Sequence, residues 1–140
     1  MNQLKCFLSS PYASNLISKE VAVWDALGAL SVLRHLRPVI HVDEVAASDR
    51  CVWSPLIQGQ VILWNTGRRW PWKVAMEWCL WCLEHGGFTD LIVATSPRKP
   101  GYGRNGMDVE ADLARKLGYR IMPQSEAERL EFFTTPQAQV

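Results

Sequence analysis

The sequence predicts a single three-layer α/β/α domain of the Rossmann-like, flavodoxin-like type, with a mainly parallel sheet of about five strands. Short apolar segments of strand type alternate with helical ones along the chain, which is typical of βαβ units. Residues 91–94 (LIVA) form a continuous apolar run, as expected for a parallel strand buried on both faces. Residues 90–121 follow the order strand, glycine-rich basic loop, helix and strand, which is one complete βαβ unit.

The composition limits the class of protein. A chain of 140 residues suits one compact domain, residues 1–140, with a frayed tail from about residue 134. The content of 48% hydrophobic and 21% charged residues argues against disorder. The formal net charge of +1 gives no reason to expect a nucleic acid polymer as partner. The sequence shows neither a membrane-spanning run nor a signal-peptide pattern, so we expect a cytoplasmic protein without membrane contact.

In the first half of the chain, residues 4–10 and 39–42 suit strands, and Asn15 suits the N-cap of a helix that runs to about residue 34. The region 42–64 is ambiguous. It holds β-prone pieces, among them 51–57 and 60–64, that compete for one or two positions in the sheet.

In the second half, residues 72–85 form a helix that is apolar on almost every side, with Pro71 at its first helical position and glycines at its end. Such a helix is buried on more than one side or lies in a subunit interface. A helix over residues 107–117, a strand over 119–122 and a polar helix from residue 124 follow.

The cysteines predict neither disulfides nor a metal site. Cys79 and Cys82 lie three residues apart inside the apolar helix, with His85 beyond them, but a second pair of ligands is missing. We interpret them as buried structural thiols. The glycines of residues 101–103 satisfy neither a dinucleotide-binding nor a Walker A pattern, so we expect no cofactor.

The strongest candidate for chemistry is Glu110. With Asn105 as N-cap, Asp108 falls at N3, where a capping box explains it. Glu110 instead shares the helix face of the apolar residues, so its carboxylate should point toward the carboxyl end of the sheet. The helix N-terminus favours the ionised form, which could act as a nucleophile or base. Alternatively, Glu110 only complements the helix dipole.

Three loops could complete a site around this carboxylate. After the first strand come Ser9, Ser10, Pro11 and Tyr12, whose hydroxyls and free N–H groups can bind a ligand, although this is also an ordinary strand-to-helix turn. Two of these loops are basic: one carries Arg68, Arg69 and Lys73, and the other carries Arg98, Lys99 and Arg104. If both rim the same pocket, an anionic ligand such as a nucleoside 5′-monophosphate is favoured, although charged loops are usually only solvated.

Tryptophans are concentrated near the basic loop that carries Arg68, Arg69 and Lys73. Trp70 and Trp72 could stack on a base or cover a neighbouring subunit, and both roles favour tryptophan. Trp78 and Trp81, three residues apart on the helix, fit the core or an interface better.

Three short motifs together resemble a known family. FLSSPYA ends the first strand, Ser54-Pro55-Leu56 follows a later strand, and residues 106–118 have the pattern G-x-x-x-E-x-x-x-A-x-x-L-G. In this order they resemble the nucleoside 2-deoxyribosyltransferase-like superfamily, and within it the DUF1937 group of small proteins. The resemblance spans roughly residues 4–122.

The resemblance implies a Rossmann-like fold, a homo-oligomer, and a glutamate that attacks the anomeric carbon of a deoxyribosyl group. Glu110 matches that glutamate, and the ligand is expected to be a nucleoside or nucleoside monophosphate. The residues expected to bind it are Ser9, Ser10, Pro11, Tyr12, Arg98, Tyr102, Arg104, Asn105 and Gly106.

Two positions depart from the family's pattern. Phe7 stands where deoxyribosyltransferases carry a tyrosine that holds the nucleophile, unless Tyr12 or Tyr102 replaces it, and Arg104 stands where they carry aspartate or serine. A hydrolase and a non-catalytic nucleotide-binding or signalling domain therefore fit as well. A protein that assembles through the helix 72–85 is a further alternative.

Overall fold

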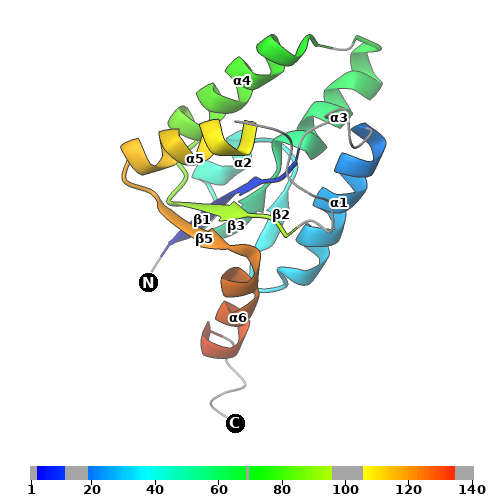
Figure 1. The fold of residues 1–140 in the computed structure, drawn as a ribbon. Coiled ribbons are helices and arrows are strands. Elements are labelled where there is room, and N and C mark those ends of the chain that lie inside the picture. The colour runs from blue at the N-terminus through cyan, green and yellow to red at the C-terminus, as the bar shows by residue number, and fades with distance from the viewer. Residues whose placement is uncertain (1–2, 12–18, 69, 96–105, 135–140) are drawn as a thin grey trace.

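The computed structural model describes residues 3–11, 19–68, 70–95 and 106–134 (Figure 1). The strands are β1 (Leu4–Ser9), β2 (Arg37–Val39), β3 (Arg50–Trp53), β4 (Asp90–Val93) and β5 (Arg120–Pro123). The helices are α1 (Lys19–Val32), α2 (Asp43–Ala46), α3 (Pro55–Thr66), α4 (Trp72–His85), α5 (Gly106–Lys116) and α6 (Gln124–Thr134). The strands form one sheet in the order β2-β3-β1-β4-β5, and every pair is parallel. This confirms the predicted three-layer fold.

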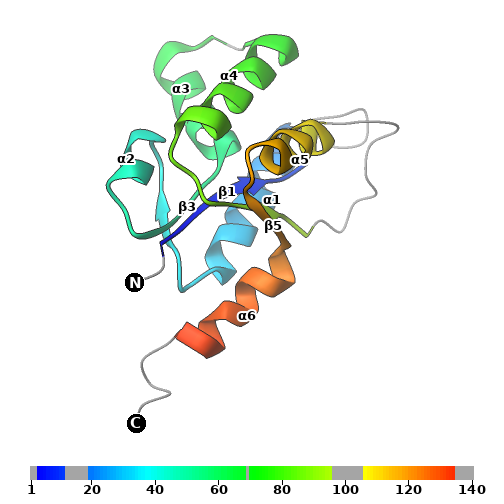
Figure 2. The same cartoon turned by 90° about the vertical axis from the view of Figure 1, so that its left-hand side faces the viewer.

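Helices cover both faces of the sheet (Figures 1 and 2). On one face, Leu8 of β1 packs in a cluster with Leu33 beyond α1 and Ala127 of α6. On the other face, Phe7 of β1 packs with residues of α2, α4 and α5. The central strand β1 is buried along its whole length, because helices lie on both sides of it.

The region 42–64 is where the sequence prediction fails. Residues 60–64 are not strand but the middle of α3. The Ser54 side chain caps this helix by accepting a hydrogen bond from the Ile57 N–H at 3.4 Å, and Pro55 follows at its first position. Gly67, with φ of 68°, ends it. β2, which was predicted over residues 39–42, instead covers Arg37–Val39.

The predicted bounds of α4 are confirmed, but Pro71 is its N-cap residue rather than its first helical one. Within the chain α4 buries one side only. Cys82 and Leu83 are buried in the core, whereas Trp72, Val74 and Trp81 are exposed. The alternative that α4 lies in a subunit interface stays a prediction. Among the described residues, no helix has both the length and the apolar character needed to cross a membrane.

Gly86, directly after α4, is predicted to tolerate no side chain. A Cβ there would lie 2.6 Å from the Cys82 carbonyl oxygen and 2.6 Å from Cε2 of Phe88, so Gly86→Ala overpacks the core. We expect this variant to lose about 2 kcal/mol of unfolding free energy in urea denaturation. The control is Gly28→Ala in α1, where a Cβ meets nothing within 4 Å, so stability should rise by about 0.5–1 kcal/mol. Equal stabilities of the two variants would contradict the close packing around Gly86.

Candidate functional site

The site lies where two neighbouring strands send the chain to opposite faces of the sheet. β1 and β4 are paired, with Ser9 opposite Val93 at their carboxyl ends. From β1 the chain continues to α1 on one face, and from β4 it continues to α5 on the other. Such a switch point opens a crevice at the carboxyl ends of parallel strands, which is where α/β proteins bind ligands.

Glu110 of α5 reaches this switch point. The Ser9 hydroxyl at the end of β1 donates a hydrogen bond to Oε1 of Glu110 at 2.6 Å. Ser9 is fully buried and Glu110 is only 5% exposed. Glu110 and Ala114 are the buried residues of α5, which confirms that Glu110 shares the inward face of this helix. A glutamate whose only role was a favourable interaction with the helix dipole could make that interaction while exposed to solvent.

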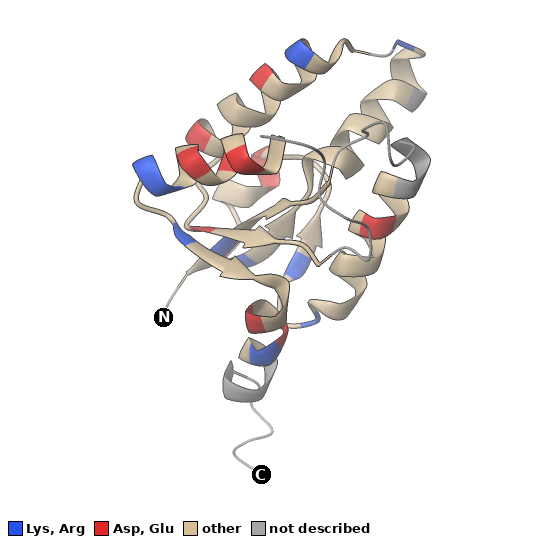
Figure 3. Cartoon of the chain, viewed as in Figure 1, with Lys and Arg blue, Asp and Glu red and all other residues tan. Residues whose placement is uncertain are grey.

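The other charged residues of α5 have different surroundings. Figure 3 shows acidic residues along α5 and basic residues at its end. Asp108 lies in the first turn, while Arg115 and Lys116 occupy the last turn, in the arrangement that the helix dipole favours. Asp112 pairs with Arg115 at 3.2 Å on the surface. Of the three acids in this helix, Glu110 is therefore the one that is turned to the sheet.

Burial changes the expected charge of Glu110. Removal from water raises the pKa of its carboxyl to about 8, although the hydrogen bond from Ser9 lowers it in part. The sequence predicted an ionised carboxylate on the basis of the helix N-terminus, and that prediction is wrong at neutral pH because desolvation dominates. With a pKa of about 8, roughly a tenth of the carboxyl groups are ionised at pH 7.

Ser9 supplies the orienting hydrogen bond that Phe7 cannot give. Successive side chains of a strand alternate between faces, so residues 7 and 9 point the same way. Phe7 is part of the core, with edge-on contacts to Trp53 at 5.5 Å and Phe88 at 5.4 Å between ring centroids. This role of Ser9 was not predicted from the sequence, although the two-residue alternation was a usable signal. Tyr12 and Tyr102, the expected substitutes, lie outside the described residues.

A pocket opens beside Glu110, and we call it the Glu110 pocket. It holds about 360 Å³ of empty space, part of which is open to solvent. Among the described residues that line it, Ser10 and Glu110 have polar side chains, and the others belong to α3, α4 and α5. The remaining lining residues are Pro55, Leu56, Trp72, Ala75, Met76, Cys79 and Gly106. A mainly apolar pocket with a few convergent polar groups is the usual form of a small-molecule site.

The Ser10 hydroxyl has no structural function that the described residues reveal. Ser10 is 7% exposed, and its Oγ is buried without a hydrogen-bond partner among the described residues. Buried hydroxyls are nearly always paired, and one left open beside a pocket is suited to a ligand. We interpret Ser10 as the second polar contact of the Glu110 pocket.

The structure brings together four of the predicted site residues: Ser9, Ser10, Gly106 and Glu110. Pro11 follows Ser10 and is half-buried. The other predicted positions, which are Tyr12, Arg98, Tyr102, Arg104 and Asn105, lie outside the described residues. The contribution of α4 to the pocket was missed, except for Trp72, which was predicted to stack on a base or to cover a neighbouring subunit and which lines the pocket with 52% of its surface exposed.

The cysteines near the site are poor nucleophiles. Burial raises the pKa of the Cys82 thiol to about 11 and also raises the pKa of Cys79, which lines the Glu110 pocket. Among the described residues, no group of three or more His, Cys, Asp or Glu side chains could hold a metal ion. Within that part of the chain, Glu110 is the reactive group that the pocket presents.

Comparisons with protein-family models, with curated proteins and with solved structures found no match to this chain. The family resemblance described above therefore stays a prediction.

Ser9→Ala tests the hydrogen bond that holds Glu110. Removing the hydroxyl leaves a buried carboxyl oxygen without its donor, so we expect a loss of about 1–2 kcal/mol in unfolding free energy at pH 6. The control is Ser31→Ala, because the Ser31 hydroxyl also donates one hydrogen bond, to the Gly28 carbonyl at 2.7 Å, but on the surface. If both variants unfold at the same urea concentration, Ser9 does not hold the carboxyl as described.

Proposed function

We propose that the chain binds a nucleoside or nucleotide in the Glu110 pocket and cleaves or transfers its N-glycosidic bond, with Glu110 as the nucleophile at the sugar C1′. The observation that carries the proposal is the buried carboxyl of Glu110, held by Ser9 at the switch point of the sheet and facing an apolar pocket. The resemblance of three motifs to deoxyribosyltransferases supports the same chemistry.

The proposed reaction uses the ionised carboxylate. Ser9 holds Oε1, so Oε2 attacks C1′ and forms a glycosyl ester. The C1′–N bond breaks, and the departing base keeps the electron pair and takes a proton from solvent. A second base or a water molecule then attacks C1′, which releases the glycosyl group and restores the carboxylate.

The experiment is to incubate the protein with deoxynucleosides and deoxynucleoside monophosphates and to follow free base by chromatography between pH 6 and pH 9. Because attack needs the ionised carboxylate and its pKa is about 8, base release should rise about tenfold per pH unit below that value and then level off. Base release that falls as pH rises would assign Glu110 the role of a general acid instead.

A second candidate function is ligand binding without catalysis. Since most Glu110 carboxyls are neutral at pH 7, they can donate a hydrogen bond to a nitrogen or carbonyl of a bound base. In this case a nucleotide raises the unfolding temperature, no base is released, and Glu110→Gln still binds because the amide also donates.

The exposed side of α4 favours the predicted homo-oligomer. Trp81 is 59% exposed and Val74 is 45% exposed, and large apolar groups of this kind are enriched in interfaces. Trp78 packs against Trp53 at 5.6 Å and belongs to the core, so its replacement would disturb the fold. The suitable test is therefore the solution mass of Trp81→Ala, which should fall relative to that of the original protein.

A further inference from the structure

A second pocket, which we call the α3–α4 pocket, adjoins the first. It holds about 620 Å³ of empty space, including space open to solvent, between α3, α4 and Val23 of α1. Four residues line both pockets: Pro55, Leu56, Ala75 and Cys79. A ligand whose reacting part lies at Glu110 can therefore extend its other part into the α3–α4 pocket.

Aromatic rings form one wall of the α3–α4 pocket. Trp70 and Trp78 both line it, and their rings meet edge to face at 5.5 Å with an interplanar angle of 79°. Trp78 is in turn held by the buried ring of Trp53. Because these rings already contact one another and the core, they lose little conformational entropy when a flat aromatic ligand packs against them.

Gly59 leaves part of the pocket empty. It lies in the middle of α3 and lines the pocket, and a Cβ built there meets no atom within 4 Å. Glycine is the least favourable helix residue apart from proline, and nothing near it requires the absence of a side chain. The space beside Gly59 is thus available to a ligand.

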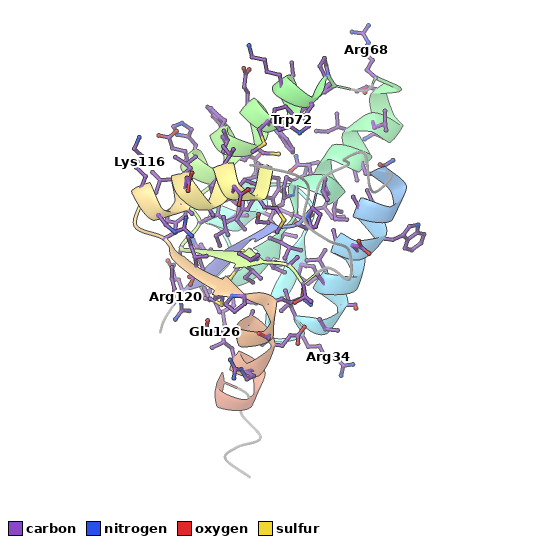
Figure 4. The ribbon with its side chains drawn as sticks, in the orientation of Figure 1. Arg34, Arg68, Trp72, Lys116, Arg120 and Glu126 are labelled. Atoms are coloured by element: carbon purple, nitrogen blue, oxygen red, sulfur yellow. The ribbon has the colours of Figure 1, made fainter. Side chains whose placement is uncertain are left out.

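Among the described residues that line this pocket, Gln60 provides an uncharged polar side chain. It is half-buried, and the described residues offer its amide no hydrogen-bond partner. An amide places a donor and an acceptor side by side, which matches the N6 and N7 edge of adenine. Arg68 also lines the pocket, but Figure 4 shows its side chain extending away from the helices, so its charge does not favour an anion inside.

We propose that the α3–α4 pocket binds a purine base, with adenine preferred, against Trp70 and with its edge hydrogen-bonded to the amide of Gln60. The inference rests on the proposed function, because it places the base of a nucleoside whose sugar reaches Glu110. It adds a substrate class, namely adenine nucleosides.

The experiment is calorimetric titration of free adenine, and of uracil for comparison, into the original protein and into Glu110→Gln. Free base contains no bond to cleave, so its binding is independent of catalysis. We expect adenine to bind both proteins equally and uracil to bind at least roughly tenfold more weakly, because its smaller ring contacts less of the wall. Absence of adenine binding, or equal affinity for uracil, would overturn the inference.

Two variants locate the binding. Gly59→Met fills the open space and should abolish adenine binding without lowering the unfolding temperature, whereas Gly28→Met makes the same change at a helical glycine outside the pocket and should bind normally. Gln60→Leu keeps the volume but removes the amide and should weaken adenine binding roughly tenfold. Unchanged affinity in Gly59→Met and Gln60→Leu would refute this location.

The two proposals fail in different ways. Base release from nucleosides together with no adenine binding in the α3–α4 pocket would sustain the role of Glu110 and refute the purine pocket. Adenine binding that depends on Gly59 and Gln60, with no base release from any nucleoside, would do the reverse.

Discussion

Glu110→Gln is expected to lower the rate of base release by about a thousandfold or more, because an amide cannot form the glycosyl ester. The change is nearly isosteric, and the amide oxygen can still accept the hydrogen bond from Ser9, so the fold should be kept. The measurement is the rate of base release at pH 8.5, where most of the original carboxyl groups are ionised.

The matched control for this prediction is Asp112→Asn. Asp112 lies on the same helix, and its carboxylate pairs with Arg115 on the surface, so the variant loses the same charge outside the pocket. Its rate of base release should equal that of the original protein. A similar loss in both variants would show that α5 needs its negative charge in general, and that Glu110 has no special role.

The second large effect concerns stability and pH. The pKa of the Glu110 carboxyl is 4.5 in a solvent-exposed setting and about 8 in the folded protein, so the folded state binds the proton more tightly. Its contribution to stability is then fully present below pH 4.5 and is lost as pH rises through 8. The expected loss is a few kcal/mol, with roughly 5 kcal/mol as the upper bound for a shift of this size.

Urea denaturation of the original protein and Glu110→Gln at pH 5, 6, 7 and 8 measures this effect. The glutamine side chain does not titrate, so the difference in unfolding free energy between the two proteins isolates the Glu110 carboxyl. We expect the original protein to lose stability relative to the variant across this range. Parallel curves would mean that the carboxyl is solvated, and that the described burial is wrong.

The parts of the fold that the sequence predicted are those with strong local signals. The apolar run of β4 and the bounds of α4, between Pro71 and Gly86, are confirmed. Residues 60–64 failed because a short apolar run suits a strand or a buried helix equally well. The deciding signals lay outside that run, in the Ser54 cap, Pro55 and Gly67.

The site was predictable to a similar extent. Helical spacing placed Glu110 on the inward face of α5, since that depends on residues within the same helix. Its protonation was not predictable, because it depends on how deeply other segments bury the carboxyl. The contributions of Met76 and Cys79 to the pocket likewise follow from how α4 packs beside α5.

In the proposed reaction, Glu110 forms a covalent bond with the sugar. The most direct test of this step is intact-mass spectrometry of the protein mixed with a deoxynucleoside at pH 8.5, followed by peptide mapping. We expect an added deoxyribosyl group on the peptide that contains Glu110, and no such adduct in Glu110→Gln. Base release that proceeds without an adduct and continues in Glu110→Gln would contradict it.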